Sequence, residues 1–242
     1  MTAVILAGGR GSRLRPYSLV LPKPLLPIGD EPLLSVLVRH LAHEGFRRIV
    51  LAGGALNDLM WAYFRDGRAH AVTMDYVAEP EPLGTFGALT LLDLNDSTLV
   101  LNGDLLTTIP FSEVMRFHCK TGASLTMVVK QVTQAVPWGV VEIEHGRVRA
   151  LSEKPEIPLW VNTGIYVVEP EAVHVLPRGE PADATVLVKL LLEQGAPVVS
   201  YATAAYWRDI GTPDAFRSAL RDYARRPELG ALHDDRSSPA PE

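Results

Sequence analysis

Cysteine is nearly absent from this sequence: Cys119 is the single one among 242 residues. The chain therefore cannot form an intrachain disulfide or a cysteine-rich metal site, and we expect Cys119 to be a buried core residue. A basic excess is also lacking, since 23 lysines and arginines stand against 28 aspartates and glutamates, for a net charge of −5. Nucleic acids and membrane surfaces select basic proteins, so neither is expected as a partner.

No long hydrophobic run opens the chain, because the apolar residues after Met1 reach Gly8 within a few positions. The segment also lacks the basic stretch of a signal peptide, so we expect a cytoplasmic protein without a membrane span. The 47% content of hydrophobic residues can fill a sizeable core. We expect one domain over residues 1–226 and a flexible tail over residues 227–242, where the apolar periodicity stops.

Two familiar phosphate-binding loops are missing. The sequence contains no Gly-Lys-Ser or Gly-Lys-Thr, which a P-loop requires, and Leu14 stands where a dinucleotide loop needs its third glycine. An apolar strand nevertheless breaks into a glycine-rich loop that is followed by Arg13 and Lys23. Glycine lets backbone N–H groups approach an anion, and the cations suit a polyphosphate such as a nucleoside triphosphate. The candidate nucleotide-binding residues here are Leu6, Ala7, Gly8, Gly9, Gly11 and Ser12.

Apolar strand-like runs alternate with amphipathic helical ones along the chain. We expect strands at 3–6, 48–52, 72–77, 98–101, 124–130, 163–168 and 198–202, and helices at 32–43, 57–67, 112–122, 184–194 and from Thr212 onward. Asp30 and Asn57 are expected to cap the first two helices. This alternation predicts an α/β fold: a doubly wound, mainly parallel, Rossmann-like sheet with helices on both faces. A β-hairpin with its turn at His145-Gly146 is expected beside that sheet.

Ligands of such sheets bind at the carboxyl ends of the strands. The glycine loop and Asp104, which follows an apolar strand, both fall at such ends, and Asp209 stands in a similar setting near the carboxyl end of the sequence. Two aspartates together with phosphate oxygens suffice for Mg²⁺, which prefers oxygen ligands and keeps several waters. A divalent ion would neutralise two anionic substrates brought together for phosphoryl chemistry.

Seven short motifs occur in an order that resembles the sugar-1-phosphate nucleotidyltransferases, or nucleoside-diphosphate-sugar pyrophosphorylases. They are residues 8–16 (GGRGSRLRP), 22–25 (PKPL), 81–85 (EPLGT), 101–104 (LNGD), 153–155 (EKP), 161–164 (VNTG) and 207–213 (WRDIGTP). The resemblance covers nearly the whole chain and is closest to short mannose-1-phosphate and heptose-1-phosphate guanylyltransferases. It implies a catalytic-domain-only enzyme that joins a sugar 1-phosphate to a nucleoside triphosphate and releases pyrophosphate, with Mg²⁺.

The resemblance also assigns roles to individual residues. The positions of Asp104 and Asp209 hold the metal ion in the family, Arg13 stabilises the departing pyrophosphate, and Lys23 contacts phosphates near the reacting centre. Lys154 corresponds to the lysine that binds the sugar phosphate. Gly84, Thr85 and Asn102 match nucleotide-binding positions, and Gly139, Glu153, Asn162 and Thr163 match sugar-binding positions.

The substrate stays open at this point. We expect GTP with a manno- or heptose-type 1-phosphate or a related cyclitol phosphate, because the two glycine segments leave room for a purine. A uridylyltransferase or thymidylyltransferase, for example one acting on N-acetylmuramate 1-phosphate, is the alternative, since Phe86 and Trp138 replace usual residues and could reshape a pocket. A non-catalytic nucleotide-sugar-binding subunit is a further alternative, and a nicotinamide oxidoreductase is disfavoured by the missing glycine. The oligomeric state is open, a homo-oligomer included.

Overall fold

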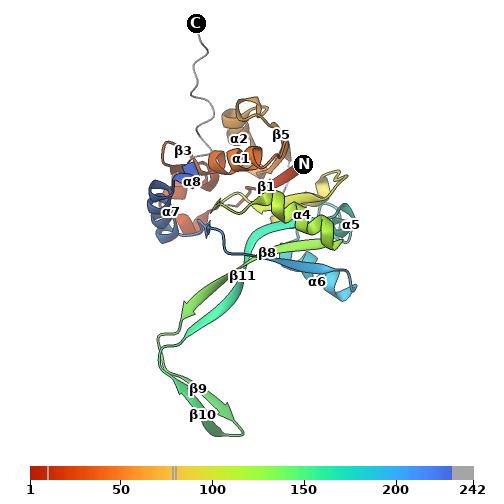
Figure 1. Cartoon of the computed structure of the whole chain (residues 1–242). Helices are drawn as coiled ribbons and strands as arrows, with labels where there is room; N and C mark the ends of the chain where they lie inside the picture. The colour runs from red at the N-terminus through yellow and green to blue at the C-terminus, as the bar shows by residue number, and fades with distance from the viewer. Residues whose placement is uncertain (10, 78, 80, 231–242) are drawn as a thin grey trace.

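The computed structural model describes residues 1–9, 11–77, 79 and 81–230. Its core is a seven-stranded sheet with the order β12-β8-β11-β6-β1-β4-β5 (Figure 1). The strands are β1 (Thr2–Leu6), β4 (Arg48–Ala52), β5 (Thr73–Val77), β6 (Thr98–Asn102), β8 (Leu125–Ala135), β11 (Glu156–Val168) and β12 (Val198–Thr203). Every pairing is parallel except those of β11, which runs antiparallel to β6 and β8. The expected mainly parallel α/β sheet is therefore confirmed.

Alternate residues of the central strands point to opposite faces, and each face has its own core. Ile5 and Leu101 belong to one cluster, which packs on α1 (Leu33–His43), α2 (Asn57–Phe64) and α4 (Phe111–Thr121). Val4 and Val100 belong to the other cluster, which packs on α3 (Gly84–Gly87), α5 (Pro170–Val173) and α6 (Ala184–Glu193). Continuous apolar strands are what a sheet covered on both faces requires.

The expected helices form, but their amino-terminal caps differ from the expectation. Helix α1 begins after Pro32 without a side-chain cap, so the capping role expected of Asp30 is wrong. Asn57 is the first residue of α2, and its side chain instead bonds the Gly53 N–H and the Val77 carbonyl, tying α2 to the ends of β4 and β5. Cys119 is exposed rather than buried, because it lies on the outer side of α4.

The β-hairpin forms with its turn at the expected residues, but the hairpin does not lie where it was expected relative to the main sheet. Strands β9 (Val140–Glu144) and β10 (Arg147–Ser152) pair around His145 and Gly146, which both have positive φ as a tight hairpin turn requires. They form the far end of a two-stranded arm that projects from the body (Figure 1). The hairpin does not lie beside the main sheet, because β8 and β11 stay paired out to Ala135 and Glu156 and carry it outward.

A third cluster joins the start of the chain to its end. It contains Leu14 of the glycine-loop region, Ile210, and Phe216 of α7 (Pro213–Arg225), whose amino terminus is capped by Thr212 as expected. Helix α8 (Pro227–Gly230) adds Leu229, which is 1% exposed. The expected flexible tail is therefore wrong for residues 227–230, and residues 231–242 lie outside the described residues.

This packing predicts that α8 stabilises the domain. Leu229→Ala should lower the free energy of unfolding by about 2 kcal/mol or more, because it leaves a cavity among buried side chains. Urea unfolding followed by circular dichroism measures the change. Leu220→Ala on the exposed side of α7 is the matched control and should cost distinctly less. Equal losses for the two variants would contradict the docking of α8.

Candidate active site

Two aspartates meet at the carboxyl edge of the sheet through a short strand pairing. Strand β7 (Leu105–Thr107) follows Asp104, and it pairs antiparallel with β13 (Trp207–Asp209), so that Asp209 lies opposite Leu105. The Ile210 N–H donates to the Asp104 carbonyl at 3.0 Å, which continues the pairing. The two carboxylates expected to bind a metal are therefore brought together from distant parts of the sequence.

Lys23 lies between these carboxylates. Its Nζ forms an ion pair with Asp104 Oδ2 and lies 3.9 Å from Asp209 Oδ1. The side chain is only 12% exposed, and it comes from a one-turn helix, Lys23–Leu25, that is flanked by Pro22 and contains Pro24. Proline restricts the backbone there, so the lysine is held in place before any ligand arrives.

The charge of Asp209 is only partly compensated. Burial raises the pKa of Asp209, and the neighbouring Asp104 raises it further, whereas Lys23 and Arg13 lower it. The net direction is upward. Two carboxylates thus share a site that holds too little positive charge for both, which is the situation that a cation would relieve.

The glycine loop between β1 and Ser12 is open at its tip and fixed at its base. Gly8 and Gly9 are exposed, and within the described residues their N–H groups donate no hydrogen bond to the protein. Gly11 has a φ of +59°, and its carbonyl accepts hydrogen bonds from the Ser18 hydroxyl at 2.7 Å and from the Leu14 N–H at 2.9 Å. The loop therefore has free N–H donors on a fixed base, which suits an anion. Arg10 lies outside the described residues.

The other expected residues of this region take two different positions. Leu6 and Ala7 anchor the loop, since the Leu6 carbonyl accepts from the Gly103 N–H and the Ala7 N–H donates to the Ala52 carbonyl. Ser12 and Arg13 are exposed on the first one-turn helix after the loop. Arg13 is close enough to Asp209 to lower its pKa, which places its charge at the same edge.

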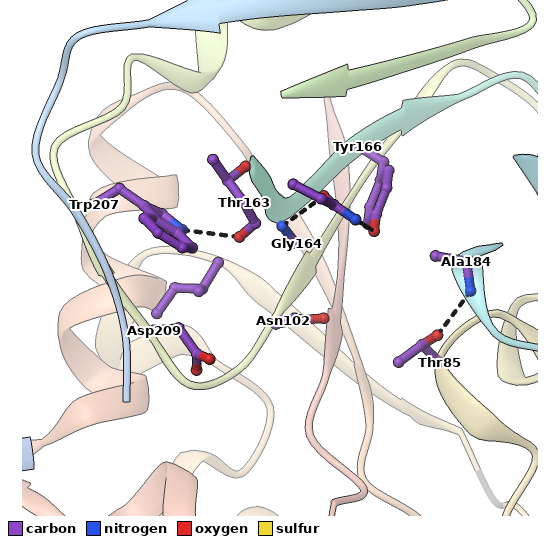
Figure 2. A pocket seen from close by; sticks show the side chains of 10 residues that line it. Thr85, Asn102, Thr163, Gly164, Tyr166, Ala184, Trp207 and Asp209 are labelled. Atoms are coloured by element: carbon purple, nitrogen blue, oxygen red, sulfur yellow. Dashed lines mark hydrogen bonds between the residues drawn. The ribbon is translucent and has the colours of Figure 1, made fainter. Parts of the chain in front are cut away.

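A pocket of about 170 Å³ opens beside Asp209 (Figure 2). Its lining residues come from five segments and are Thr85, Asn102, Leu105, Asn162, Thr163, Gly164, Tyr166, Ala184, Trp207 and Asp209. Trp207 and Thr163 form one wall, where the indole N–H donates to the Thr163 carbonyl at 2.8 Å. Thr85 and Ala184 form the opposite wall, where the Ala184 N–H donates to the threonine hydroxyl at 3.1 Å. The structure thus brings five expected site residues to one pocket, namely Thr85, Asn102, Asn162, Thr163 and Asp209.

An irregularity in β11 shapes the floor of this pocket. The register of β11 against β8 shifts between Asn162 and Tyr166, and the Asn162 side chain accepts from the Gly164 N–H at 2.9 Å and donates to the Tyr166 hydroxyl. Gly164 has a φ of +74°, and a Cβ there would lie 2.4 Å from Asn102 Nδ2. Glycine is therefore required at 164, because any side chain would displace Asn102.

Phe86 does not narrow the pocket directly, contrary to the expectation from sequence. It is fully buried behind Tyr166, and the two rings meet edge-to-face with centroids 5.0 Å apart. Gly84 is exposed, and with its φ of +72° a Cβ there would lie 2.9 Å from the Ala182 carbonyl oxygen. Thr85 is thus the residue of this segment that faces the pocket.

Three expected sugar-binding residues do not reach this pocket in the single chain. Gly139, Glu153 and Lys154 lie where the arm passes into β9 and β10, outside the pocket lining. The arm projects from the body there (Figure 1). The expectation that the glycine end of the hairpin faces the sugar therefore stays a prediction, and the exposed Trp138 beside Gly139 does not line this pocket either.

Sequence reasoning missed Glu79. One of its carboxylate oxygens accepts the Leu83 N–H at 3.2 Å, and the other lies 3.8 Å from where a Cβ on Gly8 would be. Glu79 follows β5, whose carboxyl end lies at the same sheet edge as those of β1 and β4. The rule that ligands bind at this edge could have indicated it.

A family model described as nucleotidyl transferase matches residues 2–226. The chain belongs to this nucleotidyl transferase family. The membership agrees with the fold, with the glycine loop, and with the motifs that the sequence analysis identified.

Two relatives and one solved structure show how far the likeness extends. Mannose-1-phosphate guanylyltransferase of Mycobacterium tuberculosis is 34% identical over 231 residues, and UTP–glucose-1-phosphate uridylyltransferase of Synechocystis sp. is 31% identical over 248 residues. These alignments cover 92% and 93% of this nucleotidyl transferase, which spans 64% of the length of each of these curated relatives. The crystal structure of HddC from Yersinia pseudotuberculosis has a TM-score of 0.72 at 25% identity and covers 92% of this chain and 99% of that chain.

The described part of the chain contains neither a membrane-spanning helix nor a cluster of metal-ligating side chains. None of the helices in residues 1–9, 11–77, 79 and 81–230 is long and apolar enough to cross a bilayer. The same part of the chain contains no cluster of three or more histidine, cysteine, aspartate or glutamate side chains arranged to hold a metal. Asp104 and Asp209 are two carboxylates, and Mg²⁺ bound by them would need further oxygen ligands to complete its shell.

The raised pKa of Asp209 predicts a stability cost at neutral pH. The folded chain binds this proton more tightly than the unfolded chain, so the cost is fully present above the folded pKa and absent below the unfolded value of about 3.9. Asp209→Asn should therefore raise the thermal unfolding temperature in a chelating buffer at pH 7, and the gain should shrink as the pH falls toward 4. Differential scanning fluorimetry measures both.

The exposed Asp214, whose side chain is 89% accessible, supplies the matched control. Asp214→Asn should lack the gain that Asp209→Asn shows at pH 7. If Asp209→Asn destabilised the protein at pH 7, the interpretation of this carboxylate as undercompensated would fail.

Proposed function

We propose that residues 1–226 form one catalytic domain that transfers a guanylyl group from GTP to a manno- or heptose-type sugar 1-phosphate, or a related cyclitol phosphate. The products are a nucleotide-activated sugar and pyrophosphate. The observation that carries this proposal is the placement of Lys23, Asp104 and Asp209 between the glycine loop and the pocket. The names of the relatives, which include a mannose-1-phosphate guanylyltransferase, support it.

The aspartate pair fits a magnesium ion. Asp104 Oδ1 is buried and has no hydrogen-bond partner among the described residues, so one hard oxygen is left available. Asp209 adds a second carboxylate whose pKa is raised by burial and by the neighbouring Asp104. Asp104 and Asp209 would hold the ion, which would supply charge neutralisation for the two phosphate groups.

The chain itself would position and screen the reacting phosphates. The free N–H groups of Gly8 and Gly9 would bind the triphosphate, with Gly11 and Ser12 shaping the loop. A phosphate oxygen of the sugar would attack the α-phosphorus in line, and the bond from that phosphorus to the departing pyrophosphate would break. Arg13 and Lys23 would stabilise the negative charge on the phosphates. The attacking phosphate is already ionised at neutral pH, so this reaction needs no general base.

The remaining expected residues divide between the two substrates. On the nucleotide side they are Leu6, Ala7, Gly84, Thr85 and Asn102, and on the sugar side they are Gly139, Glu153, Lys154, Asn162 and Thr163. The pocket beside Asp209 would take the sugar ring, since the Asn162 and Thr163 region gives it polar walls. Small pockets with a few convergent polar groups are typical of such sites.

Glu79 supports guanine over uracil. Its free carboxylate oxygen lies beside Gly8, at the edge where the loop would meet the nucleobase. The Watson–Crick edge of guanine presents two adjacent N–H donors, which a carboxylate can accept together, whereas uracil presents one donor between two acceptors. A uridylyltransferase, as in the Synechocystis relative, is the second candidate and would need a different contact here.

The first functional prediction concerns the metal ligands. Asp209→Asn should reduce turnover by about 100-fold or more in saturating magnesium, since one preorganised charge near the reacting phosphates is lost. Release of pyrophosphate from GTP and mannose 1-phosphate measures the rate, and an unchanged circular dichroism spectrum checks the fold. Asp214→Asn is the matched control and should retain activity. Full activity of Asp209→Asn would refute the assignment.

The second functional prediction concerns the base. The wild-type protein should use GTP over UTP and dTTP by about tenfold or more if one hydrogen-bond set decides the choice. Glu79→Gln should reduce that ratio, because an amide offers only one acceptor oxygen and adds a donor. A competition with all triphosphates present, resolved by the mass of the nucleotide-sugar, measures the ratio. A mainly uridine or thymidine product from the wild type would overturn the guanine assignment and leave the transferase assignment standing.

A further inference from the structure

The end of the arm is an amphipathic ribbon. Ile143 pairs with Val148 and Val141 pairs with Leu151, and such cross-strand pairs share one face. These four side chains, hereafter the apolar face of the arm, are 69%, 68%, 45% and 68% exposed. The opposite face is formed by Val140, Glu142, Glu144, Arg147, Ala150 and Ser152.

Such a ribbon is not stable in water by itself. Alternation of apolar and polar residues is typical of strands with one buried face, and an isolated two-stranded hairpin is marginal at best. The ribbon of β9 and β10 nevertheless projects away from the body of its own chain (Figure 1), and the side chains of its apolar face are exposed. Exposed apolar residues continue toward the body at Trp138 and Leu159. A contiguous exposed apolar surface of this kind marks an interaction site.

The pocket of the same chain lacks what the arm carries. Asp209 is the one charged residue among those that line the pocket, and no lysine or arginine lines it within the described residues. A sugar 1-phosphate bears negative charge and needs a cation on its own side of the site. Lys154 is an exposed cation between β10 and β11, at the base of the ribbon, and it does not line the pocket of its own chain.

We infer that the arm docks on a second copy of this chain and places Lys154 at the sugar-phosphate side of that copy's pocket. This inference rests on the proposed function for the role of Lys154 but not for the docking itself. A second copy supplies what both features lack: a surface for the apolar face of the arm, and a pocket in need of a cation. A two-fold exchange satisfies both copies at once, as closed dimers require.

The size of the arm suits such a dimer. Its exposed apolar side chains are Trp138, Val141, Ile143, Val148, Leu151, Ile157, Leu159 and Trp160. Two arms, each covered by the other copy, would bury on the order of 1,000 Å² or more, which reaches the size of a stable interface. A single ribbon on an unrelated partner would bury half of that and leave the pocket without its cation.

The first experiment measures the oligomeric state by sedimentation velocity. The wild type should be a dimer, and Leu151→Glu should make it a monomer, because the new charge falls on the apolar face of the arm. Ser152→Glu places the same charge on the neighbouring residue, on the opposite face, and should remain a dimer. A monomeric wild type at micromolar concentration, or equal behaviour of the two variants, would overturn the inference.

The second experiment asks which copy supplies Lys154. Chains with Lys154→Ala and chains with Asp209→Asn should each be nearly inactive in guanylyl transfer. In co-expressed mixed dimers, an exchanged arm gives one site an intact lysine and intact aspartates, so about one quarter of the wild-type activity should return for a random two-chain mixture. If the arm instead served its own chain, every site would carry one lesion, and no activity would return. That result would overturn the inference.

A cross-linking readout keeps the docking testable if no sugar phosphate proves to be a substrate. In a Cys119→Ser background, chains with Lys154→Cys are mixed with tagged chains that carry Thr85→Cys, and a short bis-maleimide is added. A cross-link between the two kinds of chain, identified by mass, supports the exchange even without turnover. If the cross-link instead formed only within a chain carrying both cysteines, the arm would fold back on its own body and the inference would fail.

Discussion

The pairing of β7 with β13 is the constraint on which the active-site region depends. Leu106 and Ile210 from these segments are fully buried in the third cluster, so the alternation of the strands directs Asp209 to the other side, at the edge of the sheet. The same pairing fixes Asp104 through its carbonyl. Two like charges are thus held together by burial of their apolar neighbours, and Lys23 offsets only part of their repulsion. The fold stabilises an arrangement that its electrostatics alone would not favour.

The antiparallel strand β11 links the central sheet to both the pocket and the arm. Because β11 runs antiparallel to β6, it enters the sheet at the edge where the carboxyl ends of the parallel strands lie. From there it continues into the core, where Ile165 and Val167 are buried. The irregularity after Asn162 turns polar groups toward the pocket before the strand becomes regular. The amino-terminal half of β11, from Glu156, pairs with β8 alone and forms part of the arm (Figure 1). A single strand therefore connects the pocket with the surface that projects farthest from it.

Local patterns in the sequence predicted most of the body and the charged edge. The strands and helices follow from apolar periodicity, and Lys23, Asp104 and Asp209 follow from their positions after strands or in motifs. The direction of the arm could not be predicted, because a hairpin with one apolar face has the same sequence whether that face packs on its own chain or on another. Asp30 failed as a cap because Glu31 and Pro32 form a short strand and the helix begins only at Leu33. Phe86 was misplaced because a motif fixes its position in the sequence but not whether it points to the pocket or behind Tyr166.

The two halves of the site differ in what holds them. Phosphate chemistry needs accurately placed charges, and in the proposed mechanism these come from Asp104 and Asp209 beside the β7–β13 pairing and from Lys23 on its one-turn helix. Glu153 and Lys154, which we assign to the sugar side, are held only by the two-stranded ribbon. The position of this ribbon depends on what covers its apolar face. In the dimer that we propose, the interface would set the position of Glu153 and Lys154, whereas Asn162 and Thr163 are held by β11 at the pocket of the body. Changes at the interface can then alter the choice of sugar phosphate without disturbing the phosphate chemistry.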